Sequence, residues 1–70
     1  MEKTVSAEVI GSRLREARGI RPKTKVAKLL GISYSSLCKY EAGLRVPKGN
    51  VKKLLADYYG VSVEELFYAN

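Results

Sequence analysis

The chain has 70 residues, with 13 lysines and arginines against 7 aspartates and glutamates, no histidine and a single cysteine, Cys38. This length predicts one domain over residues 1–70, and the composition excludes histidine-based general bases, Cys–His nucleophiles and the usual zinc sites. We therefore expect a protein that is not an enzyme and needs no metal and no cofactor. The sequence lacks a signal peptide and an apolar run of about twenty residues, which predicts a cytoplasmic protein without a membrane span.

The basic residues are concentrated in the middle of the sequence. Twelve of them lie within residues 13–53, where the acidic residues are Glu16 and Glu41. A cationic surface of this kind attracts polyanions, with nucleic acid ahead of an anionic membrane surface. Charge alone leaves a soluble basic protein without such a partner as an equal alternative.

The first predicted helix covers residues 7–18. Residues 1–6 show no period and are interpreted as a loose arm, in which Ser6 can cap the helix that follows. An apolar stripe at helical spacing supports that helix: Val9, Ile10, Leu14 and Ala17. The charged residues between them are interpreted as a solvated face: Arg13, Arg15 and Glu16.

The second and third predicted helices meet at Gly31. Ile20 is expected to fold inward before the second helix, and Pro22 to occupy a first helical position. Ser33 can cap the third helix. Apolar residues mark the inner faces: Val26, Ala27 and Leu30 in the second helix, Leu37 and Tyr40 in the third. Because glycine accepts the positive φ of a sharp corner, the pattern predicts a helix-turn-helix.

Two further helices complete a predicted all-α fold. Gly43 is expected to end the third helix, and Asn50 to cap the fourth. Ser62 and Glu65 have the spacing of a capping box, which opens a short fifth helix over about residues 63–68. The expected core consists of Val9, Ile10, Leu14, Val26, Leu30, Ile32, Leu37, Leu54, Leu55 and Leu66.

Residues 23–47 resemble the helix-turn-helix regulators of the Cro and phage-repressor type, the Xre family. Four segments match the family's first helix, two-helix reader, following loop and closing helix, in that order: IGSRLREAR, VAKLLGISYSSLCKYEAG, LRVP and GVSVEEL. The resemblance covers roughly residues 9–67. It implies a compact five-helix, lambda-repressor-like domain that binds operator DNA, usually as a dimer.

The chain departs from the family pattern in three places. The stretch from Arg18 to Ala27 is shorter than usual. Pro22 and Lys23 stand where the family commonly has Thr-Gln, so a glutamine contact to phosphate becomes a lysine contact. Tyr34 and Ser35 open the third helix, where the family often has Arg, Lys or Gln. The resemblance therefore implies that this chain recognises bases with an unusual set of side chains.

In a helix-turn-helix, the N-terminal residues of the second helix approach base edges in the major groove. The outward residues of this helix are the predicted base contacts: Tyr34, Ser35 and Lys39. Phosphate contacts are expected at helix starts and in the loop after the third helix. These predicted contacts are Lys23, Ser33, Arg45 and Lys48. The other lysines are interpreted as a solvated face: Lys25, Lys28, Lys52 and Lys53.

Two residues near the ends of the first and third helices form a predicted structural pair. The family pairs an arginine at the end of its first helix with the glutamate of its W-E-x-G-like segment, which implies a pair of Arg18 with Glu41. A solvated Arg18 is the alternative. Cys38 is interpreted as a small, half-exposed spacer, in preference to a redox switch.

The leading functional hypothesis is a sequence-specific double-stranded DNA-binding regulator, most simply a repressor on a pseudo-palindromic operator. A homodimer is expected, weak or dependent on DNA, in which part of an apolar set at the end of the chain meets the second copy. That set is Val63, Leu66, Phe67 and Tyr68. The alternatives are an antitoxin-like module with a protein partner and autoregulatory DNA binding, and non-specific nucleic-acid binding.

Overall fold

The computed structural model describes residues 4–69, which fold into five α-helices. The helices are α1 (Ala7–Arg18), α2 (Lys23–Leu30), α3 (Tyr34–Glu41), α4 (Gly49–Tyr59) and α5 (Val63–Phe67). Within this range the extended pairing is limited to one isolated antiparallel bridge, between Thr4 and Tyr68. The all-α, five-helix prediction is therefore confirmed.

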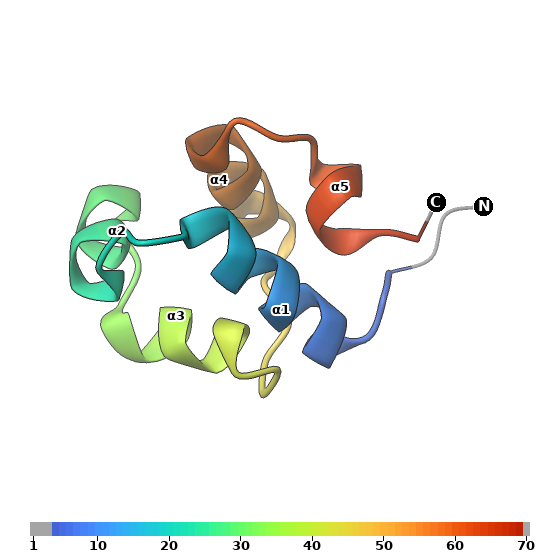
Figure 1. Cartoon of the computed structure of the whole chain (residues 1–70), viewed down its shortest axis with the longest axis horizontal. Helices are drawn as coiled ribbons and strands as arrows, with labels where there is room; N and C mark the ends of the chain where they lie inside the picture. Colours follow the sequence, from blue (N-terminus) through green and yellow to red (C-terminus); the bar gives the residue numbers. More distant parts are fainter. Residues whose placement is uncertain (1–3, 70) are drawn as a thin grey trace.

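The helix α1 runs through the middle of the molecule, with α2 and α5 at opposite ends (Figure 1). It packs against α3 and α5, while α2 packs against α3 and α4. The Cα atoms span 34 × 23 × 21 Å. Of the predicted reader, α2 thus lies at one end of the molecule and α3 extends from there alongside α1, while Thr4 and Tyr68, near the two ends of the described chain, are paired.

The five helices differ in whether a side chain caps their first turn. Ser6, Ser33 and Ser62 each accept a hydrogen bond from a backbone N–H in the first turn of α1, α3 and α5, as predicted. By contrast, α2 and α4 begin after Pro22 and Lys48, and neither has a side-chain cap. Pro22 therefore lies one position before its expected place, and the predicted cap by Asn50 is wrong because α4 already begins at Gly49.

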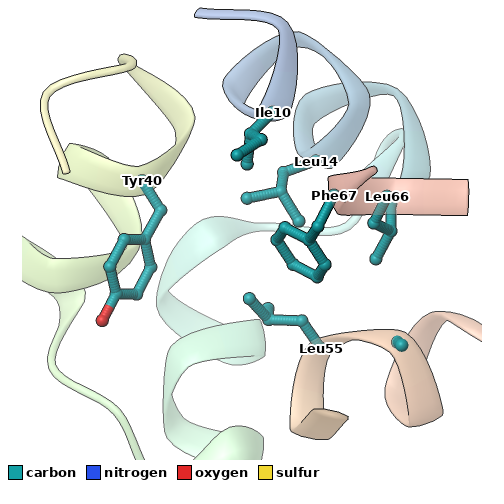
Figure 2. Packing of buried hydrophobic residues seen from close by; sticks show 7 residues of the cluster. Ile10, Leu14, Tyr40, Leu55, Leu66 and Phe67 are labelled. Carbon is teal, nitrogen blue, oxygen red and sulfur yellow. The ribbon is translucent and has the colours of Figure 1, made fainter. Parts of the chain in front are cut away.

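The main core forms where α1, α3, α4 and α5 converge. Ile10 and Leu14 of α1 point toward Leu55 of α4 and Phe67 of α5, with the ring of Tyr40 beside them (Figure 2). A second cluster of buried residues joins α2 to α3: Val26, Ala27 and Leu37. Burial of these side chains is the main source of stability for a chain this short.

Of the ten residues of the predicted core, six are buried, two are half-buried and two are exposed. Val9 and Leu54 are 40% and 44% exposed, because each lies about 100° around its helix from the buried residue that follows it. Leu30 and Ile32 are half-buried. Phe67, which the expected core omits, is fully buried. The apolar end of the chain therefore faces mostly into its own core.

Ile20 is fully exposed, so the expectation that it folds inward is wrong. The N–H of Arg21 donates to the carbonyl of Arg18 at 3.1 Å and closes a turn. Gly19 and Ile20 are the two central residues of that turn. The backbone hydrogen bond thus places Ile20 at the outer corner of the connection between α1 and α2.

The interpretation of residues 1–6 as a loose arm is wrong for the part that the structure describes. Thr4 pairs with Tyr68, and the N–H of Val5 donates to the carbonyl of Phe67 at 3.0 Å. Residues 1–3 lie outside the described residues. The segment before α1 therefore joins the two ends of the described chain.

The backbones of α1 and α3 are in close contact at Gly11. A Cβ atom at this position would clash with the backbone carbonyl of Glu41. Gly11 is buried and lies between Ile10 and Leu14 on the inner side of α1. Glycine at this position therefore allows the end of α3 to rest directly on the backbone of α1.

Candidate nucleic-acid interface

The helices α2 and α3 form the predicted corner at Gly31. This glycine has φ 71° and ψ 26°, the left-handed conformation that costs glycine no Cβ clash. The N–H of Ile32 donates to the carbonyl of Ala27 at 3.1 Å, which ends α2. Small Ala27 is buried with Leu37 at the contact between the two helices. The local sequence thus fixes the angle of α3 against α2.

The helix α3 has a buried side and an exposed side. Leu37 and Tyr40 are buried, while Tyr34 is 51% exposed. Ser35 and Lys39 are also exposed. The three predicted base contacts therefore share the outer side of α3, where a phenol, a hydroxyl and an ammonium group are offered to solvent.

Ser33 is occupied by local hydrogen bonds at the start of α3. Its Oγ accepts from the N–H of Ser36 at 2.9 Å, and its hydroxyl donates to the Oγ of Ser36 at 2.8 Å. The predicted cap is thus present. Both interactions keep the first turn of α3 closed, which orients Tyr34 and Ser35.

The starts of α2 and α4 present backbone N–H groups next to lysines. Lys23 is the first residue of α2, and Lys48 directly precedes α4. Lys48 and Arg45 are exposed, and Lys23 is half-buried. Because neither helix has a side-chain cap, its first N–H groups and its positive dipole end remain open to an anion. Sequence reasoning expected phosphate contacts at helix starts, but it assigned a cap by Asn50 to the fourth helix and so missed that this start is open.

Arg18 and Glu41 form a bidentate pair, and it is the single ion pair within residues 4–69. Arg18 donates from Nε to Oε2 at 2.7 Å and from Nη2 to Oε1 at 3.0 Å. Glu41 is only 2% exposed. The hydrogen bond to this carboxylate raises the pKa of Arg18. The pair therefore connects the end of α1 to the end of α3.

The interpretation of Arg13, Arg15 and Glu16 as a solvated face is confirmed for Arg15 and Glu16, which are exposed, and is wrong for Arg13, which is half-buried. Arg13 donates from Nη1 to the carbonyls of Glu65 and Tyr68, at 3.1 and 3.2 Å. Arg15 donates to the backbone carbonyl of Glu41. These bonds satisfy carbonyls at the C-terminal ends of α5 and α3, where a cation also complements the helix dipole.

Lys52 is likewise half-buried and does not belong to a solvated face. Its Nζ lies 5.1 Å from the ring centre of Tyr68 and 5.7 Å from that of Phe67, within the range of a cation–π interaction. The remaining three lysines of the predicted solvated face are exposed: Lys25, Lys28 and Lys53. The cations nearest to α5 thus bind the protein itself.

Tyr59 is a polar group that lacks a partner among the described residues. Its hydroxyl is buried and forms no hydrogen bond there. Burial, with a smaller contribution from the charge of Glu41, raises the pKa of Tyr59 to about 12. The hydroxyl is therefore a local cost to stability that nothing in the surrounding bonds offsets.

Residues 4–69 contain no group of three or more side chains suited to hold a metal ion. Cys38 is a half-buried free thiol. No helix in the same range is long and apolar enough to cross a membrane.

Comparisons with known proteins agree with the helical corner. The family model described as a helix-turn-helix domain matches residues 12–67. The YazB protein of Bacillus subtilis (strain 168), described as an uncharacterized HTH-type transcriptional regulator, is 38% identical over 64 residues, which cover 89% of this chain and 93% of YazB. No solved structure matches the chain significantly. The chain belongs to the helix-turn-helix domain family.

Proposed function

We propose that the protein is a sequence-specific, double-stranded DNA-binding transcriptional regulator of the Cro and phage-repressor type, and that α3 is its recognition helix. The observation that carries the proposal is the exposed side of α3, the helix that follows the corner at Gly31, where Tyr34, Ser35 and Lys39 are open to solvent. Membership of the helix-turn-helix family and the name of the relative YazB support the same function.

Each exposed residue of α3 has a chemical role in this proposal. Lys39 donates to O6 or N7 of guanine, and the hydroxyl of Ser35 bonds to any of several base edges. The ring of Tyr34 contacts a thymine methyl group. Since serine discriminates weakly between bases, part of the specificity depends on the shape of the DNA.

The phosphate contacts are assigned to helix starts and to the loop after α3. Lys23 and Lys48 combine an ammonium group with the open N–H groups of α2 and α4, which together suit a phosphate. Arg45, exposed in the loop between α3 and α4, adds a third contact. Ser33 retains an acceptor and backbone groups near α3, but its hydroxyl already serves the helix.

A regulator of this kind acts most simply as a repressor that binds as a dimer. Recognition helices of two-fold dimers lie about 34–36 Å apart, one turn of DNA. We therefore propose a pseudo-palindromic operator that is covered by two copies.

Selection of bound sequences from a random duplex pool tests the proposed function. At about 150 mM salt, non-specific binding is typically weaker than about 1 µM, so specific duplexes dominate the recovered pool. We expect a motif with two half-sites about one DNA turn apart. An unenriched pool would refute sequence-specific binding.

Sedimentation at rising protein concentration, with and without the selected duplex, tests the dimer separately. We expect two protein copies on each duplex and a weaker tendency to dimerise without it. One copy on each duplex at every concentration would contradict the dimer and leave DNA binding intact.

A further inference from the structure

The residue before Pro22 is held by two aromatic rings. The guanidinium carbon of Arg21 lies 5.4 Å from the ring centre of Tyr58 and 5.7 Å from that of Tyr59. The two rings meet edge to face, with centroids 5.2 Å apart and planes at 65°. Both distances are within the range of a cation–π interaction, which arginine forms readily with its flat guanidinium group. We call these three residues the Arg21 clamp.

The backbone of Arg21 is fixed as well. Its carbonyl accepts a hydrogen bond from Nη1 of Arg18 at 2.8 Å, and its N–H donates to the carbonyl of Arg18. Arg18 is itself bound to Glu41 at the end of α3. Arg21 is thus connected to α1 and α3 through Arg18, and to the end of α4 through the two tyrosines.

The first turn of α2 has few stabilising contacts of its own, so interactions with residues outside the helix are needed to hold it in position. Pro22 gives α2 no side-chain cap, and the first hydrogen bond of the helix runs from the N–H of Val26 to the carbonyl of Pro22 at 3.1 Å. Only Val26 and Ala27 are buried in α2, and both lie beyond its first turn. The position of Lys23 therefore depends on the residues that precede the helix.

We propose that Arg21 is a positioning residue for the phosphate contact of α2. The Arg21 clamp holds the start of α2 against α4, so that Lys23 and the open N–H groups of the first turn face one phosphate together. Arg21 acts through Lys23 and does not itself touch the DNA. This inference rests on the proposed DNA binding and adds to it the group that orients one contact.

A double-mutant cycle on DNA binding tests the proposal. The affinity of Arg21→Ala, Lys23→Ala and the double variant for the selected duplex is measured between about 50 and 200 mM salt. The salt slope is the slope of the logarithm of the affinity against the logarithm of the salt concentration. Each phosphate contact contributes about one unit to it, which corresponds to roughly a threefold change in affinity across this range. We expect each single variant to lose about one unit and the double variant to lose no more than either.

Two results of the cycle would overturn the proposal. If the losses in slope add in the double variant, Arg21 contacts a phosphate independently of Lys23. If Arg21→Ala keeps the slope of the original protein, the clamp does not position the contact.

Tyr58 provides a control that changes no charge. We expect Tyr58→Leu to reproduce the loss in slope, because it removes one ring from Arg21, whereas Tyr58→Phe keeps the ring and restores the original slope. A normal slope in Tyr58→Leu, with a reduced one in Arg21→Ala, would show that Arg21 acts through its own charge and would contradict the proposal.

Amide hydrogen exchange in the protein without DNA separates the clamp from the function. We expect the N–H of Val26 to exchange faster in Arg21→Ala, while that of Ile10, which donates to Ser6 at the start of α1, keeps its rate. Equal acceleration at both amides would indicate a general loss of stability and overturn local positioning. If the original protein bound no duplex, the proposed function would fail together with this inference. Intact DNA binding with unchanged exchange at Val26 would overturn the clamp alone.

Discussion

The arginines of α1 and the lysines around α3 carry the same charge but have different surroundings. Every arginine of α1 donates hydrogen bonds to another part of the protein: Arg13 to the end of α5, Arg15 to the end of α3, and Arg18 to Glu41 and Arg21. The three lysines that are proposed to contact DNA form no ion pair within residues 4–69: Lys23, Lys39 and Lys48. One set binds the helices together, and the other is open to a partner.

This difference follows from the shapes of the two side chains. A guanidinium group presents several donors in a flat fork, which suits the carbonyls at helix ends and the carboxylate of Glu41. An ammonium group on a flexible stem stays hydrated and can approach a phosphate from many directions. The formal net charge of +6 thus includes cations that are already bound by the protein. The comparison teaches that the surroundings of each cation, rather than the net charge, indicate which cations can meet DNA: Arg45 is exposed although it is an arginine, and Lys52 is half-buried although it is a lysine.

The largest expected effect concerns the pair of Arg18 with Glu41. Removing one partner leaves the other with an uncompensated charge in a mostly buried site, so Arg18→Ala and Glu41→Ala should each lower the free energy of unfolding by about 3 kcal/mol. The double variant should lose clearly less than the sum. Urea denaturation of the three variants measures this coupling. Strictly additive losses would mean that the two side chains do not act as a pair.

The close approach of α1 to α3 gives the next effect. Gly11→Ala places a Cβ against the carbonyl of Glu41, and we expect it to lower the free energy of unfolding by about 1–3 kcal/mol. Gly49→Ala is the matched control, because a Cβ there meets nothing within 4 Å; its effect should stay within about 0.5 kcal/mol. Equal stability of both variants would contradict the direct contact of the two helices.

Arg13 and Lys48 allow the two groups of cations to be compared directly. Arg13→Ala should lower the free energy of unfolding by about 1–2 kcal/mol, since two carbonyls lose their donor, and should leave the salt slope of DNA binding unchanged. Lys48→Ala should change stability by less than about 0.5 kcal/mol and reduce that slope by about one unit. Denaturation and binding titrations measure both quantities. The reverse pattern would show that the two roles are exchanged.

The smallest effect is expected at Tyr59. Its pKa, raised to about 12 by burial, exceeds the value of about 10 in an unfolded chain. Between these pH values the unfolded chain has released a proton that the folded chain keeps, so stability falls as the pH rises from about 10. Tyr59→Phe should flatten this decline and, near pH 7, raise stability by at most about 1 kcal/mol. A lower stability of Tyr59→Phe at neutral pH would reveal a hydrogen bond to the hydroxyl.

Much of the fold was predictable because its signals are local. Serines at the starts of α1, α3 and α5, and Gly31 at the corner, act within a few residues of their own positions. The inner faces of α2 and α3 follow from helical periodicity for the same reason. The candidate base contacts depend only on which side of α3 is buried, so their exposure was predictable too.

The remaining features depend on contacts between distant parts of the sequence. Arg15 reaches a carbonyl 26 residues away, and Arg13 reaches one 55 residues away, and no pattern near either arginine indicates these partners. Only the family resemblance predicted the partner of Arg18. Val9 and Leu54 were misplaced because periodicity fixes the direction of an apolar stripe but not its width.

The most direct test of α3 as the recognition helix is an NMR titration of the protein with the selected duplex, followed through its backbone amides. We expect the largest changes in amide chemical shift at the start of α3, around Tyr34 and Ser35, and at the starts of α2 and α4. Amides of α5 and of the segment that pairs Thr4 with Tyr68 should change little. Changes centred on α5, with α3 unaffected, would contradict the assignment of α3 as the helix that reads DNA.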